Sequence, residues 1–354
     1  MGHFLLHRLL RTFPAVWGVV SVIFIISRLL TQEQVLNHRF GEGETGSHVA
    51  SPAQRQLAEL QIRQRLGLTA PLFYFSAAPP PVAGLALRWQ WNGAHNQYHN
   101  WLRQLLHADL GVSFRDDQPV VSLLLQSLRY TLPLTIGAAL SCLALAWLLT
   151  PRLGRKSRGR SLLLTSLYLI DAAPLFVVSL LLLLLLANPE MVALFPAYGL
   201  GREDPTATWL VHFQTMAYHL ALPMLTLTLA SLPALVVQLD AALNHELRAD
   251  YVLTARAKGL PDALVIRRHV LRNALIPVLA LLTELLPSLV AGSVVVEMIF
   301  SLPGMGRLLA AAAAAHDYPV LLGGVLTVAL VRVWGQVVAD WLSFQADPRI
   351  RLPL

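Results

Sequence analysis

Long apolar runs separated by polar stretches set the pattern of this chain. Apolar residues dominate the ranges 12–30, 130–149, 162–187, 218–239, 274–300 and 320–344. A helix of about 20 residues crosses the roughly 30 Å hydrocarbon core of a bilayer. The pattern therefore predicts six membrane-spanning helices, and hence an all-α, polytopic membrane protein.

The polar stretches divide the chain into three predicted parts. Residues 1–30 hold the N-terminus and the first helix, residues 31–127 form an extracytoplasmic segment, and residues 128–354 form a five-helix core. Within the outer segment, residues 52–68 have helical spacing. The three Trp in residues 88–106 are typical of a membrane–water interface. We expect this insertion after the first helix to be a small helical domain.

Charge sets the predicted orientation. The net charge is +7, but only 13% of the residues are charged, compared with about 25% in soluble proteins. Basic residues concentrate at the N-terminus and at 151–160, 248–272 and 349–351. Because cytoplasmic loops carry an excess of Lys and Arg, both termini and a loop at 240–273 are predicted to be cytoplasmic. This rule explains the basic balance better than nucleic-acid binding does.

The most informative polar stretch is DYVLTARAKGLPDALVIRRHVLRNALIP, residues 250–277. A short helix can run up to Lys258, Gly259 suits the left-handed position past a helix end, and Pro261 can open a second helix. Two short helices at an angle are typical of an element that docks in the groove of a cytoplasmic partner. An ordinary basic loop is the alternative.

TARAKGL followed by RRHVLRNALIP resembles the cytoplasmic loop of ABC-transporter permease subunits of the dipeptide/oligopeptide import family. In the general importer pattern, Glu-Ala-Ala is followed by three residues and Gly. Here Leu253, Thr254 and Ala255 stand in the first three places, and Gly259 stands in the last. The missing Glu is a departure that the peptide-type branch shares.

Further motifs extend the resemblance over nearly the whole chain. HADLGVSFRDDQPV at 107–120 is similar to the family's DLG-S…PV motif, and HDYPV at 316–320 is similar to its Asp-Tyr-Pro. VVVEMIFSLPGMGRL at 294–308 closely resembles its Glu-x-x-Phe-x-x-Pro-Gly-x-Gly signature. The tail ADPRIRL resembles its usual cytoplasmic ending.

The resemblance implies a type I ABC importer permease, moving peptides or similar small solutes across the cytoplasmic (inner) membrane of a bacterium. It implies a homologous second permease subunit, two P-loop ATPase subunits and an extracytoplasmic substrate-binding protein as partners. The residues implied in coupling to the ATPase are Asp250, Tyr251, Thr254, Ala255, Arg256, Ala257, Lys258, Gly259 and Leu260. Those implied in an outer gate, or in contact with the substrate-delivering protein, are Glu297, Phe300, Pro303, Gly304 and Gly306. A simple structural turn is the alternative for this second set.

No catalytic or cofactor motif accompanies these features. The chain lacks the G-x-x-x-x-G-K-[ST] phosphate-binding loop, so ATP and Mg²⁺ are expected only in partner chains. HEL at 245–247 lacks the second His of H-E-x-x-H. His95 and His99, and likewise His212 and His219, are weak candidates for metal binding. We therefore expect a non-catalytic subunit without a metal or nucleotide of its own.

Three acids leave other functions open. Asp171, Glu284 and Asp340 lie in or near predicted spans, where a charge at mid-bilayer costs about 2.5–3.5 kcal/mol on insertion scales. They could line a polar path or relay protons, or face other helices near the ends of the spans. A self-contained secondary transporter or channel would need inverted repeats, and no convincing repeat relates residues 1–177 to 178–354. A permease of an exporter is a further alternative.

Overall fold

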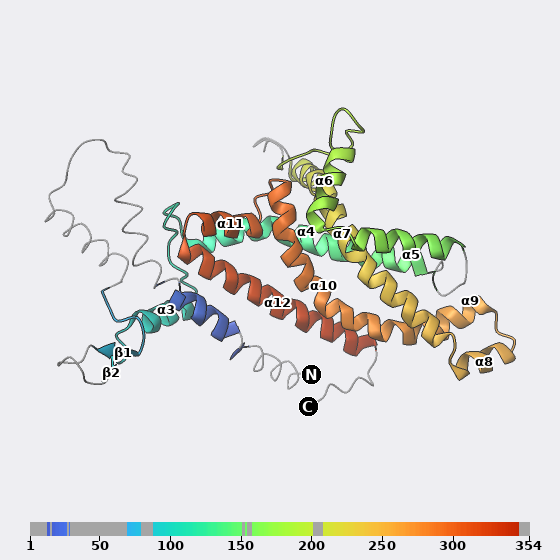
Figure 1. Cartoon of the computed structure of the whole chain (residues 1–354), viewed down its shortest axis with the longest axis horizontal. Helices are drawn as coiled ribbons and strands as arrows, with labels where there is room; N and C mark the ends of the chain where they lie inside the picture. Colours follow the sequence, from blue (N-terminus) through green and yellow to red (C-terminus); the bar gives the residue numbers. More distant parts are fainter. Residues whose placement is uncertain are drawn as a thin grey trace. The chain divides into compact units, whose positions relative to one another are not determined.

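The computed structural model is mostly helical over the residues that it describes, which are 13–14, 16–26, 28, 69–78, 88–150, 153, 158–200 and 208–346. The helix predicted at 52–68, the N-terminal basic group and the tail at 349–351 lie outside the described residues. The described elements after the first apolar helix (Val16–Ile26) are β1 (Phe75–Ala78), β2 (Arg88–Trp91), α3 (Gln97–Leu106), α4 (Val120–Leu149), α5 (Arg158–Asp171), α6 (Leu175–Leu186), α7 (Trp209–Glu246), α8 (Asp250–Ala257), α9 (Asp262–Val265), a π-helical segment (Ile266–Val270), α10 (Leu271–Ile299), α11 (Met305–Ala314) and α12 (Tyr318–Ala346) (Figure 1).

Three helices of the described chain are long and apolar enough to cross a membrane. They are α4, α7 and the part of α12 from Tyr318 to Val338. The pair of α5 and α6 brings the number to four if the pair counts as one broken span. α10, with 29 residues, matches α12 in length, and the first apolar helix is the described part of the span predicted at 12–30.

The span predicted at 162–187 is not one straight helix. α5 ends at Asp171, α6 begins at Leu175, and the two helices are bent by 107° at this break. Pro174 precedes α6 directly and has an extended ψ of 142°. A proline disfavours the helical conformation of the residue before it, so the chain leaves the helix just before Pro174 and restarts after it.

Helical structure extends into the predicted cytoplasmic loop at 240–273. α7 continues to Glu246 and contains both Pro223 and Pro233, while α9, the π-helical segment and α10 follow one another without a gap up to Ile299. Hydropathy marks where a helix leaves the bilayer core, whereas backbone hydrogen bonds can extend the helix into polar sequence. The helix ends therefore differ from the loop boundaries that hydropathy predicts.

The outer segment contains strands as well as a helix, so the expectation of a small helical domain was wrong in part. β1 and β2 pair antiparallel, with Phe75 opposite Trp91 and Ala78 opposite Arg88. Successive side chains of each strand point to opposite faces of this two-stranded sheet. The Trp residues that indicated a membrane interface therefore lie partly on a hairpin, where Trp89 and Trp91 are exposed.

The chain forms two compact units. One contains residues up to Leu124 together with Ala312–Leu326, and the other contains Leu125–Ala311 and the residues from Thr327 onwards. In the first unit, Phe24 is fully buried and stacks on Trp101, with ring centroids 4.8 Å apart. Tyr98 and Leu322 complete this cluster.

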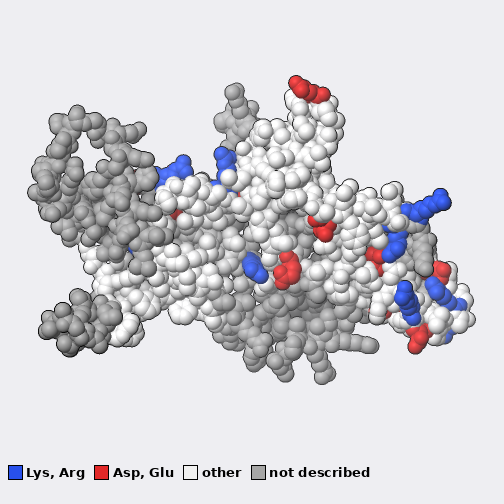
Figure 2. Space-filling model, viewed as in Figure 1, with Lys and Arg blue, Asp and Glu red and all other residues white. Residues whose placement is uncertain are grey.

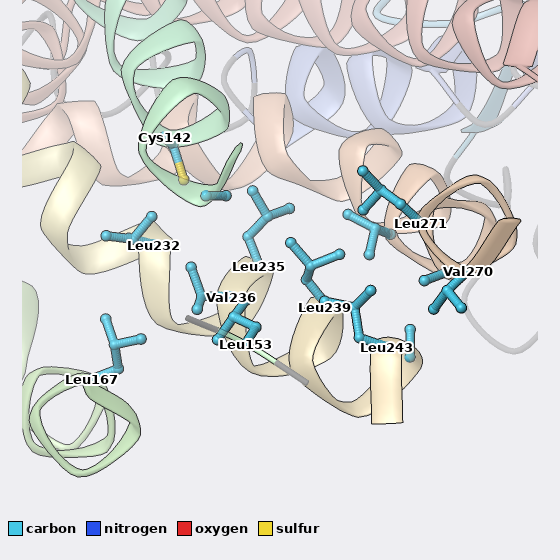
Figure 3. Close-up of a cluster of buried hydrophobic side chains, with 14 of the residues drawn as sticks. Cys142, Leu153, Leu167, Leu232, Leu235, Val236, Leu239, Leu243, Val270 and Leu271 are labelled. Carbon is cyan, nitrogen blue, oxygen red and sulfur yellow. The ribbon is translucent and has the colours of Figure 1, made fainter. Parts of the chain in front are cut away.

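α7 is the centre of the second unit, where it packs against α5, α6 and α10. Two apolar clusters run along it. The first core cluster joins α4, α5, α7, α8 and the start of α10, and includes Leu235, Val236 and Leu243 (Figure 3). The second core cluster includes Leu222, Leu289 and Phe300. The first cluster thus connects the short helix α8 to the long helices.

Candidate functional site

The turn between α8 and α9 has the predicted geometry. Lys258 ends α8, and Gly259 follows with φ +79°, a left-handed conformation that glycine adopts without steric cost. The Gly259 N–H donates to the Arg256 carbonyl at 2.9 Å. Pro261 is the N-cap of α9, and the Arg256 Nε donates to Asp262 at 3.0 Å across the turn. The prediction of a helix, a glycine turn and a second helix opened by Pro261 is confirmed.

α8 has one buried and one exposed face. Val252 is fully buried and Ala255 is 8% exposed, and both belong to the first core cluster. Leu253 is 62% exposed, and Thr254 and Ala257 are exposed beside it. Of the predicted coupling residues, Ala255 therefore faces the core, and the exposed face is the one that can contact a partner.

Charged side chains of both signs lie next to this exposed face. Arg256 and Lys258 are exposed, as are Asp250 and Asp262, and Figure 2 shows Lys and Arg together with Asp and Glu around α8 and α9. An exposed Leu among charges of both signs suits docking in the groove of a partner of mixed charge.

Tyr251 holds α8 to the end of α7. Its hydroxyl donates to the Glu246 carboxylate at 2.6 Å. Burial raises the pKa of Tyr251, and its hydrogen bond to Glu246 raises this pKa further, so the hydroxyl remains a donor at neutral pH. With Val252 and Ala255, this bond makes α8 part of a continuous packed path to α7.

The second predicted set surrounds the buried carboxylate of Glu297, which has no exposed surface. Thr131 of α4 donates its hydroxyl to Oε1 at 2.7 Å, and the backbone N–H of Gly306 donates to Oε2 at 2.7 Å. The N–H of Arg307 lies 3.3 Å from the same oxygen. The Thr131 hydroxyl in turn accepts the N–H of Met305 at 2.8 Å.

These bonds satisfy the free N–H groups at the start of α11. The first N–H groups of a helix have no partner within the helix, and a carboxylate there is favourable. Gly304 and Gly306 are needed because a side-chain carbon at Gly304 would overlap with the Glu297 carboxylate and one at Gly306 would overlap with the backbone of Val294. Glu297 thus fixes the turn that leads from α10 into α11.

Most of the predicted outer residues are buried. Phe300 is 1% exposed, and Gly304 and Gly306 are also buried, whereas Pro303 is exposed. This placement favours the structural-turn interpretation for Glu297, Phe300 and the glycines. Pro303 is the member of this set that can reach another protein.

The structure also joins two motifs that the sequence left apart. The Asp317 carboxylate, 2% exposed, accepts the Ser113 hydroxyl at 2.5 Å and the N–H of Phe114 at 3.2 Å. Ser113 belongs to the DLG-S motif and Asp317 to the Asp-Tyr-Pro motif, 204 residues later. Asp317 therefore holds the turn before α4 against the start of α12 within one compact unit.

Sequence reasoning missed an ion pair between α5 and α7. The Arg160 guanidinium contacts the Asp240 carboxylate at two points, Nε to Oδ1 at 2.8 Å and Nη2 to Oδ2 at 2.5 Å. The Asp240 side chain is 7% exposed, and Asn244 donates to its Oδ2 at 3.1 Å. Arg160 had been counted only in the basic stretch at 151–160, so its role as a partner was not predicted.

We expect Arg160→Ala to lower the stability of the purified chain by about 2 kcal/mol, because it removes the guanidinium that contacts both oxygens of the buried Asp240 carboxylate. This is below the 3–5 kcal/mol for breaking a fully buried pair, since the Arg160 side chain is 27% exposed. Thermal unfolding in detergent measures the loss. The double variant Arg160→Ala/Asp240→Asn should recover about half of it, and losses that simply add would contradict the pairing.

A cavity of about 410 Å³ lies between α6, α7 and α10. Its walls are mainly Leu and Ala side chains, and its polar side chains are Ser231 of α7 and Glu284 and Ser288 of α10. Of the three acids singled out in the sequence, Glu284 opens into this cavity, Asp171 is exposed at the end of α5, and the Asp340 side chain lies outside the described part.

His95 and His99, the first pair of weak metal candidates, do not share a helix. His95 precedes α3, whereas His99 lies inside it and bonds the Tyr74 hydroxyl through Nδ1 at 3.0 Å. His212 and His219 both lie on α7, where each Nδ1 contacts a backbone oxygen, of Thr208 and Gly199 respectively. Within the described residues no three His, Cys, Asp or Glu side chains group as metal ligands do.

Comparison with known proteins gives a family and its relatives. The family model described as binding-protein-dependent transport system inner membrane component matches residues 128–352. The chain is 28% identical to the dipeptide transport system permease protein DppB of Escherichia coli (strain K12) over 99% of both chains. It is 27% identical to the oligopeptide transport system permease protein AppB of Bacillus subtilis (strain 168), over 99% of both. It is 30% identical to the probable D,D-dipeptide transport system permease protein DdpB of E. coli K12, over 94% of this chain and 95% of that one.

Proposed function

The chain belongs to the family of binding-protein-dependent transport system inner membrane components, the permease subunits of ABC importers, and we propose that it forms the membrane pathway of an ATP-driven importer of peptides or similar small solutes. The observation that carries the proposal is the α8–Gly259–α9 element, which presents an exposed face while its other face belongs to the core. The peptide class is supported by the relatives, which are permeases for dipeptides and oligopeptides.

Coupling would act through the packing of α8. The exposed face with Leu253 and Thr254 is the proposed contact with an ATPase subunit, and Gly259 provides the turn behind it. When two ATPase subunits close on ATP, a docked α8 moves with them. Val252 and Tyr251 transmit this movement to α7, so the state of the ATPases biases the helices between inward-facing and outward-facing arrangements.

The proposed membrane arrangement has six spans. They are the first apolar helix, α4, the bent pair of α5 and α6, α7, α10 and α12, with both termini in the cytoplasm of a bacterium and residues 31–127 outside. A homologous second permease would complete the pathway, two P-loop ATPase subunits would bind ATP and Mg²⁺, and a substrate-binding protein would deliver the solute. This chain would bind no nucleotide and catalyse no reaction itself.

The test is a purification of the tagged chain from its native membrane in mild detergent, with every partner identified by mass. We expect a second six-span permease and P-loop ATPases to co-purify, and peptides with their binding protein to stimulate the ATPase activity. A chain that emerges alone or as a homo-oligomer, and takes up solute in response to a proton or sodium gradient without ATP, would instead be a secondary transporter. ATP-driven movement of solute outwards would indicate an exporter.

A further inference from the structure

The cavity between α6, α7 and α10 contains a carboxylate in otherwise apolar surroundings. Glu284 lies near the middle of the 29-residue helix α10 and is exposed to the cavity. The hydroxyls of Ser231 and Ser288 line the same space from facing helices. The remaining lining residues are Leu, Ala and Gly, so the cavity is polar only at these three positions.

Glu284 differs from the buried acids of the second unit, because its side chain is exposed to the cavity. Glu297 and Asp240 are each held by several donors within the protein. For Glu284, no side-chain hydrogen bond or ion pair joins it to another residue in the described part of the chain. A carboxylate near the middle of a proposed span is costly unless it has a partner, which indicates a partner outside the described part of the chain.

We propose that Glu284 binds the positively charged amino group of a peptide in transit, with Ser231 and Ser288 as neighbouring hydrogen-bond acceptors. The proposal rests on the proposed function, since it names a subsite on the peptide pathway. An ammonium group has three N–H donors and a positive charge, which match one carboxylate and two hydroxyl oxygens. The aliphatic walls suit the apolar side chains of a peptide.

The size of the cavity fits this occupant. About 410 Å³ is within the roughly 300–1,000 Å³ of ordinary small-molecule sites. This volume is large enough for the first residues of a peptide. A basic side chain of the second permease is the competing partner for Glu284, and the experiment separates the two.

The experiment measures charge selectivity at the cavity with a cysteine reporter in the intact complex in lipid nanodiscs. Cys142 is the chain's single cysteine and is buried, so it is first replaced by Ser. Ser288→Cys then places a thiol beside Glu284, and Ser231→Cys serves as a second reporter if the first variant fails to assemble. The probes are a trimethylammonium methanethiosulfonate, which is cationic, and a sulfonatoethyl methanethiosulfonate, which is anionic.

We expect the cationic reagent to react about fivefold faster than the anionic one, relative to their rates with a free thiol, because Glu284 attracts one and repels the other. Glu284→Gln should abolish this preference, and the matched control Asp171→Asn, an exposed acid outside the cavity, should keep it. A dipeptide with a free amino group should slow the reaction severalfold more than its N-acetylated form, and only when Glu284 is present.

Three results would overturn the proposal. They are equal relative rates for the two reagents, no reaction at either reporter because a second subunit covers the cavity, and equal protection by free and acetylated dipeptides. The proposed function is judged separately, by peptide stimulation of ATPase activity in the complex without the cysteine substitutions. A complex that peptides stimulate but that shows no charge preference would retain the function and lose the subsite.

Discussion

Glu297→Ala is expected to destabilise the purified chain by about 3 kcal/mol and to release α11 from the end of α10. The substitution removes the acceptor of the Thr131 hydroxyl and of the Gly306 N–H, both of which are buried. Each buried donor left without a partner costs about 1–3 kcal/mol. Apolar packing cannot replace these hydrogen bonds, because the groups left without a partner include one of the first N–H groups of a helix.

The apparent midpoint of thermal unfolding in detergent should fall by about 5 °C or more. Glu297→Gln keeps an acceptor oxygen and should lose less than half as much, and Thr131→Val should fall between the two. Glu190→Ala is the matched control, since Glu190 is an exposed acid outside this network. A Glu297→Ala chain that unfolds within 1 °C of the parent would show that the carboxylate does not hold this turn.

Local chemistry explains what could be predicted from sequence. Gly259 and Pro261 determine the break between α8 and α9 through their own backbone preferences, so a stretch of twelve or so residues was enough to predict it. The apolar runs likewise predicted the helical class, because a long run of apolar residues is a local signal that depends on no distant partner. The same local signal at Pro174 was present but was outweighed by the length of the apolar run around it.

Contacts between distant segments explain what was missed. Glu297 was singled out, but its burial depends on Thr131, 166 residues away. Arg160 and Asp240 are 80 residues apart, and in sequence each looked like an ordinary charge at the edge of a loop. Asp317 meets Ser113 in the same way. A single sequence gives no sign of such pairs, because each partner alone resembles an ordinary polar or charged residue.

The α8–α9 turn gives the prediction with the largest effect on function. Gly259→Arg is expected to reduce ATP-driven uptake at least tenfold and to remove peptide stimulation of the ATPases, while the chain still inserts and folds. No heavy atom lies within 4 Å of a side-chain carbon built at Gly259, so the fold tolerates the larger residue. The left-handed φ of +79° costs an L-residue about 1–2 kcal/mol, which local adjustment of an exposed turn can absorb.

Uptake and ATPase activity are measured in proteoliposomes that contain the whole complex, and detergent extraction checks insertion. Gly93→Arg is the matched control, because Gly93 has a φ of +63° and equally open surroundings but precedes α3 in the outer segment. If coupling depends on α8 docking against an ATPase, only Gly259→Arg should lose transport, since a bulky cation beside Lys258 changes the docking face. Normal peptide-stimulated ATPase activity in Gly259→Arg would place the coupling contact elsewhere. Equal losses in both variants would trace the defect to backbone strain rather than to the α8 surface.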